Sequence, residues 1–135
     1  MTMYILDTDT CIYWLKGREG IREKVLQIVP DNLRITMVTL AELKYGAYNS
    51  QKVPENLQNI ENFLKTVSVL PFDQESADRF GKIRVHLRRS GQVIDDFDIL
   101  IAAATLIHGG VLVTSNTEHF KRIPGLVLEN WLVNE

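Results

Sequence analysis

The segment covering residues 99–107 constrains the fold more than any other part of the chain, because every residue in it except Thr105 is apolar. A helix that is apolar on all sides cannot face water and must be packed between other layers of a protein. Asp98 lies in the first turn of this predicted helix, which runs over 96–108. A buried, ionised carboxylate needs a hydrogen-bond donor, a counter-charge or a metal ion. The helix N-terminus itself supplies only about 0.3–1 kcal/mol. Asp98 is therefore either a helix-terminal acid or a functional one.

The length and composition indicate one globular domain over residues 1–135. With 45% hydrophobic and 24% charged residues, the chain can bury a substantial core. No apolar run is long enough to cross a bilayer, and the first residues lack the pattern of a signal peptide. Cys11 is the single cysteine, so no internal disulfide forms. We expect a cytoplasmic protein without membrane contact. A net charge of −2 argues against nonspecific coating of nucleic acid.

Five short apolar runs alternate with helical patterns, which predicts an α/β fold with a parallel sheet covered on both faces. The strands are expected at 4–6, 34–38, 67–70, 111–114 and 126–128. The helices are expected at 11–15, at 21–29, from a Thr39-x-x-Glu42 capping box, from Pro54, between Asp73 and Ser90, and at 96–108, with only a connection over 120–125. In such sheets, function gathers at the carboxyl ends of the strands, where the strand order reverses.

Three acids are expected to meet at that edge. Asp7 follows the first strand, while Glu42 and Asp98 each lie near the start of a helix. Acids brought together without bases raise one another's pKa, which a divalent cation relieves. Mg²⁺ prefers oxygen ligands and activates water for attack on a phosphodiester. Structural alternatives stay open: Asp7 can cap a turn, and the capping box fully explains Glu42.

Two further groups of charged residues have alternative interpretations. Asp95 is interpreted as the cap of the helix over 96–108, and Asp96 either shares that role or approaches the metal as an outer ligand. A run of basic residues on the preceding helix either contacts a nucleic-acid backbone or is a solvated face. These residues are Arg79, Lys82, Arg84, Arg88 and Arg89.

Four motifs together resemble the PIN domain of VapC-type toxins. They are Leu-Asp-Thr-Asp at 6–9, Thr-Leu-Ala-Glu-Leu-x-Tyr-Gly-Ala at 39–47, Asp-x-x-Ile-Ala-Ala at 98–103, and Leu-Val-Thr-Ser-Asn-x-x-x-Phe-x-x-Ile-Pro-Gly at 112–125. The resemblance implies a three-layer α/β/α sandwich around a mainly parallel sheet. It also implies an endoribonuclease dependent on Mg²⁺ or Mn²⁺, an RNA substrate, a cognate antitoxin that blocks the site, and a homodimer.

The resemblance also implies roles for individual residues. Asp7 and Asp98 hold the ion, and Glu42 orients or deprotonates the attacking water. Many members carry a fourth acid where this chain has Asn116, which lowers the charge available for a second metal. Asn116, with Ser115 beside it and with Thr8 or Thr114, is expected to position water or phosphate.

Two rival functions are weighed against this one. The Asp7-Thr8-Asp9-Thr10 segment is similar to the nucleophile motif of haloacid-dehalogenase-type phosphatases, with Asp7 as the nucleophile. The later motifs of that family occur here in the wrong order, since Asp95-Asp96 precede Thr114-Ser115. The second rival is a catalytically inactive PIN-like binding protein, for which the missing fourth acid leaves room. His119 is an outside candidate because it lies close to Asn116 in the sequence.

Overall fold

The computed structural model describes residues 2–132. Its five strands are parallel and follow the order β3-β2-β1-β4-β5. They are β1 (Tyr4–Leu6), β2 (Leu33–Thr36), β3 (Ser68–Leu70), β4 (Val111–Val113) and β5 (Leu128–Glu129). The helices are α1 (Thr8–Leu15), α2 (Glu19–Leu26), the 3₁₀ helix η1 (Pro30–Asn32), α3 (Met37–Tyr48), α4 (Val53–Phe63), α5 (Gln74–Arg89), α6 (Asp96–His108) and α7 (Thr117–Phe120).

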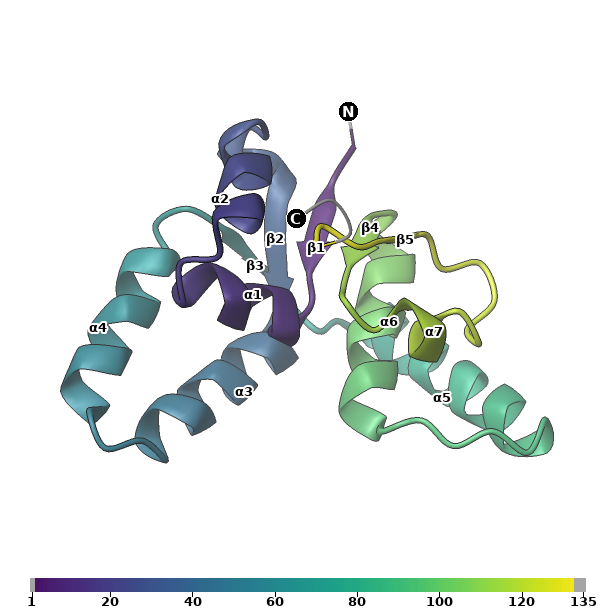
Figure 1. The fold of residues 1–135 in the computed structure, drawn as a ribbon. Helices are drawn as coiled ribbons and strands as arrows, with labels where there is room; N and C mark the ends of the chain where they lie inside the picture. Colours follow the sequence, from purple (N-terminus) through teal and green to yellow (C-terminus); the bar gives the residue numbers. More distant parts are fainter. Residues whose placement is uncertain (1, 133–135) are drawn as a thin grey trace.

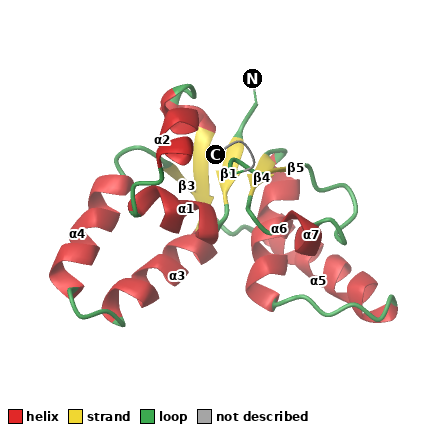
Figure 2. Cartoon of the chain, in the orientation of Figure 1, coloured by secondary structure: helices red, strands yellow, loops and turns green. Residues whose placement is uncertain are grey.

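Helices cover both faces of the sheet. Helices α1 to α4 lie on one side of the strands, and α5, α6 and α7 lie on the other (Figures 1 and 2). Neighbouring residues of a strand serve the two faces in turn: Leu6 packs in the core beneath α1 to α4, and Ile5 packs in the core beneath α5 and α6. The predicted three-layer α/β/α sandwich is therefore confirmed.

Helix α6 is as deeply buried as its composition predicts. Ile101, Ala102 and Ala103 are all 0% exposed. Asp95 caps the helix by accepting a hydrogen bond from the Phe97 backbone N–H at 2.9 Å, as expected. Within residues 2–132, no helix combines the length and the apolar character that a bilayer crossing requires.

The strand order reverses between β1 and β4. The chain moves outward from β1 through β2 to β3, and then returns to place β4 on the other side of β1. The carboxyl ends of two adjacent strands are thus followed by segments that leave toward opposite faces, α1 after β1 and α7 after β4. This is the place where parallel α/β sheets form a crevice for ligands.

Several predicted boundaries are wrong. Helix α2 ends at Leu26, so the helix expected at 21–29 is too long at its end. Strand β2 ends at Thr36, so the expected strand over 34–38 is too long. Helix α1 begins directly after Asp7, earlier than the expected 11–15. The expected connection over 120–125 is preceded by the short helix α7, which four residues are too few to reveal by periodicity. The last strand is β5 at 128–129 in place of 126–128.

Gly110 allows β4 to approach β1 closely. A Cβ at this position would lie 2.7 Å from Ile5 Cδ1 and 3.1 Å from the Met3 carbonyl oxygen. The Met3 carbonyl accepts a hydrogen bond from Val111, and Ile5 is fully buried, so neither neighbour can move freely. We expect Gly110→Ala to lower the free energy of unfolding by about 1–3 kcal/mol, measured by urea denaturation. Gly81→Ala, which meets open space on α5, is the control and should be neutral or stabilising. A Gly110→Ala protein as stable as the wild type would contradict the close-approach explanation.

Candidate active site

Asp7 is the most deeply buried acid of the site, with 6% of its surface exposed. It is the N-cap of α1: Oδ1 accepts a hydrogen bond from the Thr8 N–H at 2.8 Å, and Oδ2 accepts one from Thr114 Oγ1 at 2.8 Å. Burial, followed by the negative charges of Asp9 and Asp98, raises the pKa of Asp7 from 3.8 to about 7, although the hydrogen bonds from Thr114 and Thr8 lower it. Asp7 therefore has the capping role that was expected as an alternative, but capping does not offset the cost of ionising this buried carboxyl group.

Glu42 is held at the same edge by a hydroxyl group of α1. Thr36 caps α3 by accepting a hydrogen bond from the Thr39 N–H at 3.1 Å, so the predicted capping box of Thr39 with Glu42 is wrong. Glu42 lies one turn further along the helix, and its Oε1 accepts a hydrogen bond from Thr8 Oγ1 at 2.7 Å. Because no cap explains Glu42, its position beside α1 requires another explanation. The Thr8 hydroxyl donates this hydrogen bond to Glu42, and its expected role in positioning water or phosphate stays a prediction.

Asp98 enters the site from α6. Burial raises its pKa, the nearby His119 lowers it, and the charges of Asp95 and Glu42 raise it. His119 Nε2 lies 3.0 Å from Asp98 Oδ2. The mutual effects of Asp98 on Asp7 and of Glu42 on Asp98 show that the three predicted acids share one electrostatic environment.

Asp9 is a fourth acid at this edge, which the sequence analysis did not assign to the site. Its Oδ2 accepts hydrogen bonds from the Ser115 backbone N–H at 3.1 Å and from Ser115 Oγ. The same oxygen lies 3.5 Å from Thr114 Oγ1. Asp9 thus links the start of α1 to the end of β4. Asp9 lies two residues after Asp7, and this spacing was the available signal in the sequence. Asp9 was not assigned because the first helix was expected to begin only at residue 11, whereas α1 begins at Thr8.

The segment after β4 closes the site from the other side. Thr114 Oγ1 accepts a hydrogen bond from the Asn116 N–H at 3.0 Å while donating to Asp7. Asn116 itself is exposed and makes no side-chain cap contact to α7. Its amide is therefore accessible to a ligand, and its predicted role in positioning water or phosphate stays a prediction.

The donor set fits a hard divalent cation. Asp7, Asp9, Glu42 and Asp98 lie at one edge of the sheet. The raised pKa of Asp7 reflects first its burial and then the negative charges of Asp9 and Asp98, and a bound cation would stabilise the ionised carboxylate against both. Within the described residues, no three Asp, Glu, His or Cys side chains converge closely enough to hold an ion by themselves. Mg²⁺ commonly takes one or two carboxylates and completes its coordination with water and phosphate oxygens, so this set of acids is sufficient.

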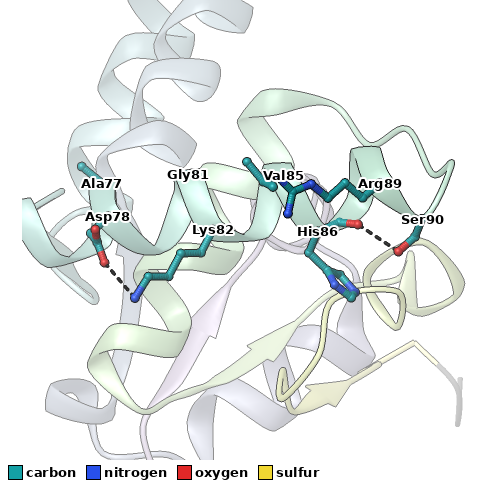
Figure 3. A pocket seen from close by; sticks show the side chains of 8 residues that line it. All are labelled: Ala77, Asp78, Gly81, Lys82, Val85, His86, Arg89 and Ser90. Carbon is teal, nitrogen blue, oxygen red and sulfur yellow. Dashed lines mark hydrogen bonds and ion pairs between the residues drawn. The ribbon is translucent and has the colours of Figure 1, made fainter.

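The predicted basic residues do not form one stripe. Lys82 and Arg89 line a hollow on the outer side of α5, where Lys82 pairs with Asp78 at 3.3 Å (Figure 3). Arg84 and Arg88 line a different hollow, near the start of α6. Arg79 lines neither of these two hollows, and none of the four acids of the site lines them either.

Asp96 belongs to the second of these hollows. Arg84 Nε lies 3.1 Å from Asp96 Oδ1. Asp96 is thereby engaged with a base of α5, and no contact in the structure supports its expected role as an outer or alternate metal ligand.

Comparison with known proteins identifies the family. The PIN domain pattern matches residues 4–126. The chain belongs to the PIN-domain family. This membership excludes the haloacid-dehalogenase alternative, in agreement with Asp95-Asp96 opening a helix instead of ending a strand.

Similar PIN-domain proteins match this chain over nearly its whole length. The tRNA(fMet)-specific endonuclease VapC of Shigella flexneri is 37% identical over 131 residues, covering 97% of this chain and 99% of the relative. Ribonuclease VapC2 of Rickettsia felis is 34% identical over 131 residues, covering 96% and 98%. The solved structure of DNA-bound VapBC from Salmonella typhimurium has a TM-score of 0.92 at 38% identity, covering 97% of this chain and 99% of that one.

Proposed function

We propose that this PIN domain is a metal-dependent endoribonuclease and the toxin of a toxin-antitoxin pair. The observation that carries the proposal is that Asp7, Glu42 and Asp98 lie beside the switch point between β1 and β4, where Asp7 is hydrogen-bonded to Thr114 and Glu42 to Thr8, and where the charge of Asp98 acts on Asp7 and that of Glu42 acts on Asp98. The Shigella and Rickettsia relatives, which are an endonuclease and a ribonuclease, support the same activity. The reaction is hydrolysis of an RNA phosphodiester bond.

The three acids have two tasks in this proposal, metal binding and activation of water. Asp7 and Asp98 hold Mg²⁺ or Mn²⁺, which when bound lowers the pKa of water and stabilises negative charge on the phosphate. Glu42 is fixed by the Thr8 hydroxyl, and its carboxylate orients the attacking water and accepts its proton. Thr114 holds Asp7 in place from the neighbouring strand. The exposed Asn116 amide positions the phosphate or a water beside it.

Chelation tests the metal requirement. Purified protein incubated with a pool of structured RNA and Mg²⁺ or Mn²⁺ should cut the RNA, and excess EDTA should stop the reaction. Asp98→Asn should lower the rate by about a thousandfold, because it removes a charge that holds the ion. Asp31→Asn, an exposed acid in η1 directly before β2, is the matched control and should keep the wild-type rate, because it lies away from the carboxyl ends of the strands.

Two results would contradict the proposal. Cleavage that persists in EDTA would remove the metal from the mechanism. An Asp98→Asn protein that is as toxic to cells as the wild type would favour the inactive PIN-like binding protein.

We also propose an antitoxin partner and a homodimer. The Salmonella and Rickettsia structures are VapBC complexes, which supports the antitoxin. A groove between α1, α3 and α4 reaches Glu42, so a partner segment seated there would block the acids. Copurification with the protein encoded by the adjacent reading frame, followed by light scattering of the free chain, tests the two parts separately.

RNA contacts by the basic residues of α5 remain part of the proposal. Because Lys82 with Arg89, and Arg84 with Arg88, lie in different hollows, they offer two separate phosphate contacts.

A further inference from the structure

We infer that His119 is a positioning residue for Asp98, an inference that rests on the proposed metal-dependent activity. His119 Nε2 and Asp98 Oδ2 lie 3.0 Å apart, and both side chains are partly buried. Since an ionised carboxylate can only accept hydrogen bonds, the imidazole nitrogen is the donor. Among the described residues, His119 is the only group within hydrogen-bond distance of the Asp98 side chain.

The imidazole is held rigidly enough for this task. His119 belongs to α7, whose last residue, Phe120, is 1% exposed and packs in the core beneath α6. The Phe120 ring meets the imidazole edge to face, with ring centres 5.5 Å apart. Ile123 is buried in the same core just after α7. Two buried side chains thus anchor the chain directly after His119, at the end of α7, and they fix the position from which His119 reaches Asp98.

The contact with His119 occupies one of the two carboxylate oxygens of Asp98. Because Oδ2 accepts the hydrogen bond, rotation of the carboxylate is restricted, and Oδ1 would be available to a cation. The other two acids are restrained in the same way, Asp7 by Thr114 and Glu42 by Thr8. Carboxylates that bind metals are usually oriented by such outer partners, whose loss costs about 10- to 100-fold in metal affinity or activity.

Two variants of His119 separate a hydrogen-bonding role from a packing role. His119→Leu keeps apolar bulk beside Phe120 but has no donor, whereas His119→Gln places an amide N–H at a reach similar to that of Nε2. We expect the leucine variant to bind Mn²⁺ about tenfold more weakly in isothermal titration calorimetry, and the glutamine variant to stay within threefold of the wild type. Raising the Mn²⁺ concentration should restore most of the leucine variant's cleavage rate. His86→Ala, on the outer side of α5, is the matched control and should bind Mn²⁺ normally.

Three outcomes would overturn the inference. The first is wild-type Mn²⁺ affinity in His119→Leu with an increased KM for RNA, which would make His119 a substrate contact. The second is an equal loss of affinity in the leucine and glutamine variants at unchanged melting temperature. If leucine lowers the melting temperature, His119→Ala replaces it in the comparison. The third is a wild-type protein that neither binds Mn²⁺ nor cleaves RNA, which would remove the proposed function and this inference with it.

Discussion

Asp7→Asn is expected to abolish RNA cleavage and at the same time to stabilise the metal-free protein by about 2 kcal/mol at pH 8. The pKa of Asp7 rises from 3.8 to about 7, and a shift of that size corresponds to about 4 kcal/mol against the ionised form. Asn is neutral and escapes this cost. It has one oxygen for the two donors, Thr8 N–H and Thr114 Oγ1, so we expect only part of the gain.

The stabilisation should depend on pH in a defined direction. Because the folded-state pKa of Asp7 is raised, ionisation of Asp7 costs the wild-type protein stability as the pH rises from about 4 to about 7, and Asp7→Asn lacks this contribution. Urea denaturation in EDTA across this range measures the difference. A stability difference between the two proteins that stays constant from pH 4 to pH 8 would show that Asp7 ionises as easily in the folded as in the unfolded protein, and would remove the electrostatic basis of the site.

The second large effect is expected in metal binding below neutral pH. Asp7 must lose its proton to hold the cation, so Mn²⁺ affinity should fall about tenfold per pH unit between pH 7 and pH 5, with about one proton released for each ion bound. Calorimetry in buffers of different ionisation enthalpy measures both quantities.

Asp9→Asn provides the matched variant for this pH dependence. Asp9 is the neighbouring charge that raises the pKa of Asp7 most after burial, so its removal should move the midpoint of the pH profile to lower pH. An unchanged midpoint in Asp9→Asn would show that Asp9 does not act on Asp7. A wild-type affinity that is flat from pH 5 to pH 8 would exclude Asp7 as a ligand.

The sequence predicts the parts of the fold that depend on apolar periodicity. Helix α6 and its cap at Asp95 follow directly from an unbroken apolar run after an acid-rich turn. The five parallel strands also follow from short apolar runs separated by helices. The strand order and the pairing of β1 with β4 depend on tertiary packing, and the sequence analysis did not predict them.

The site was predicted less completely than the fold, for local reasons. The capping box was expected to begin at Thr39, but β2 ends at Thr36 and α3 begins directly after it, so Thr36 is the N-cap of α3. Asp9 was overlooked because a turn was expected before residue 11, whereas α1 begins at Thr8 and has Asp9 in its first turn. The sequence analysis predicted that a buried Asp98 needs a hydrogen-bond donor, a counter-charge or a metal ion. It named His119 only because His119 lies close to Asn116 in the sequence. A contact across 21 residues, such as that of His119 with Asp98, leaves no periodic signal in the sequence.

The bond between Asp7 and Thr114 joins residues 107 positions apart, and β1 cannot acquire its neighbour β4 until that later segment exists. On a ribosome, a growing chain that has emerged only through β3 therefore holds Asp7 and Glu42 but lacks Asp98, His119 and the wall formed by β4. Such a nascent chain cannot assemble the cutting site. For the proposed toxin, this topology delays activity until β4 has been made, so that an inhibitor becomes necessary only near the end of translation.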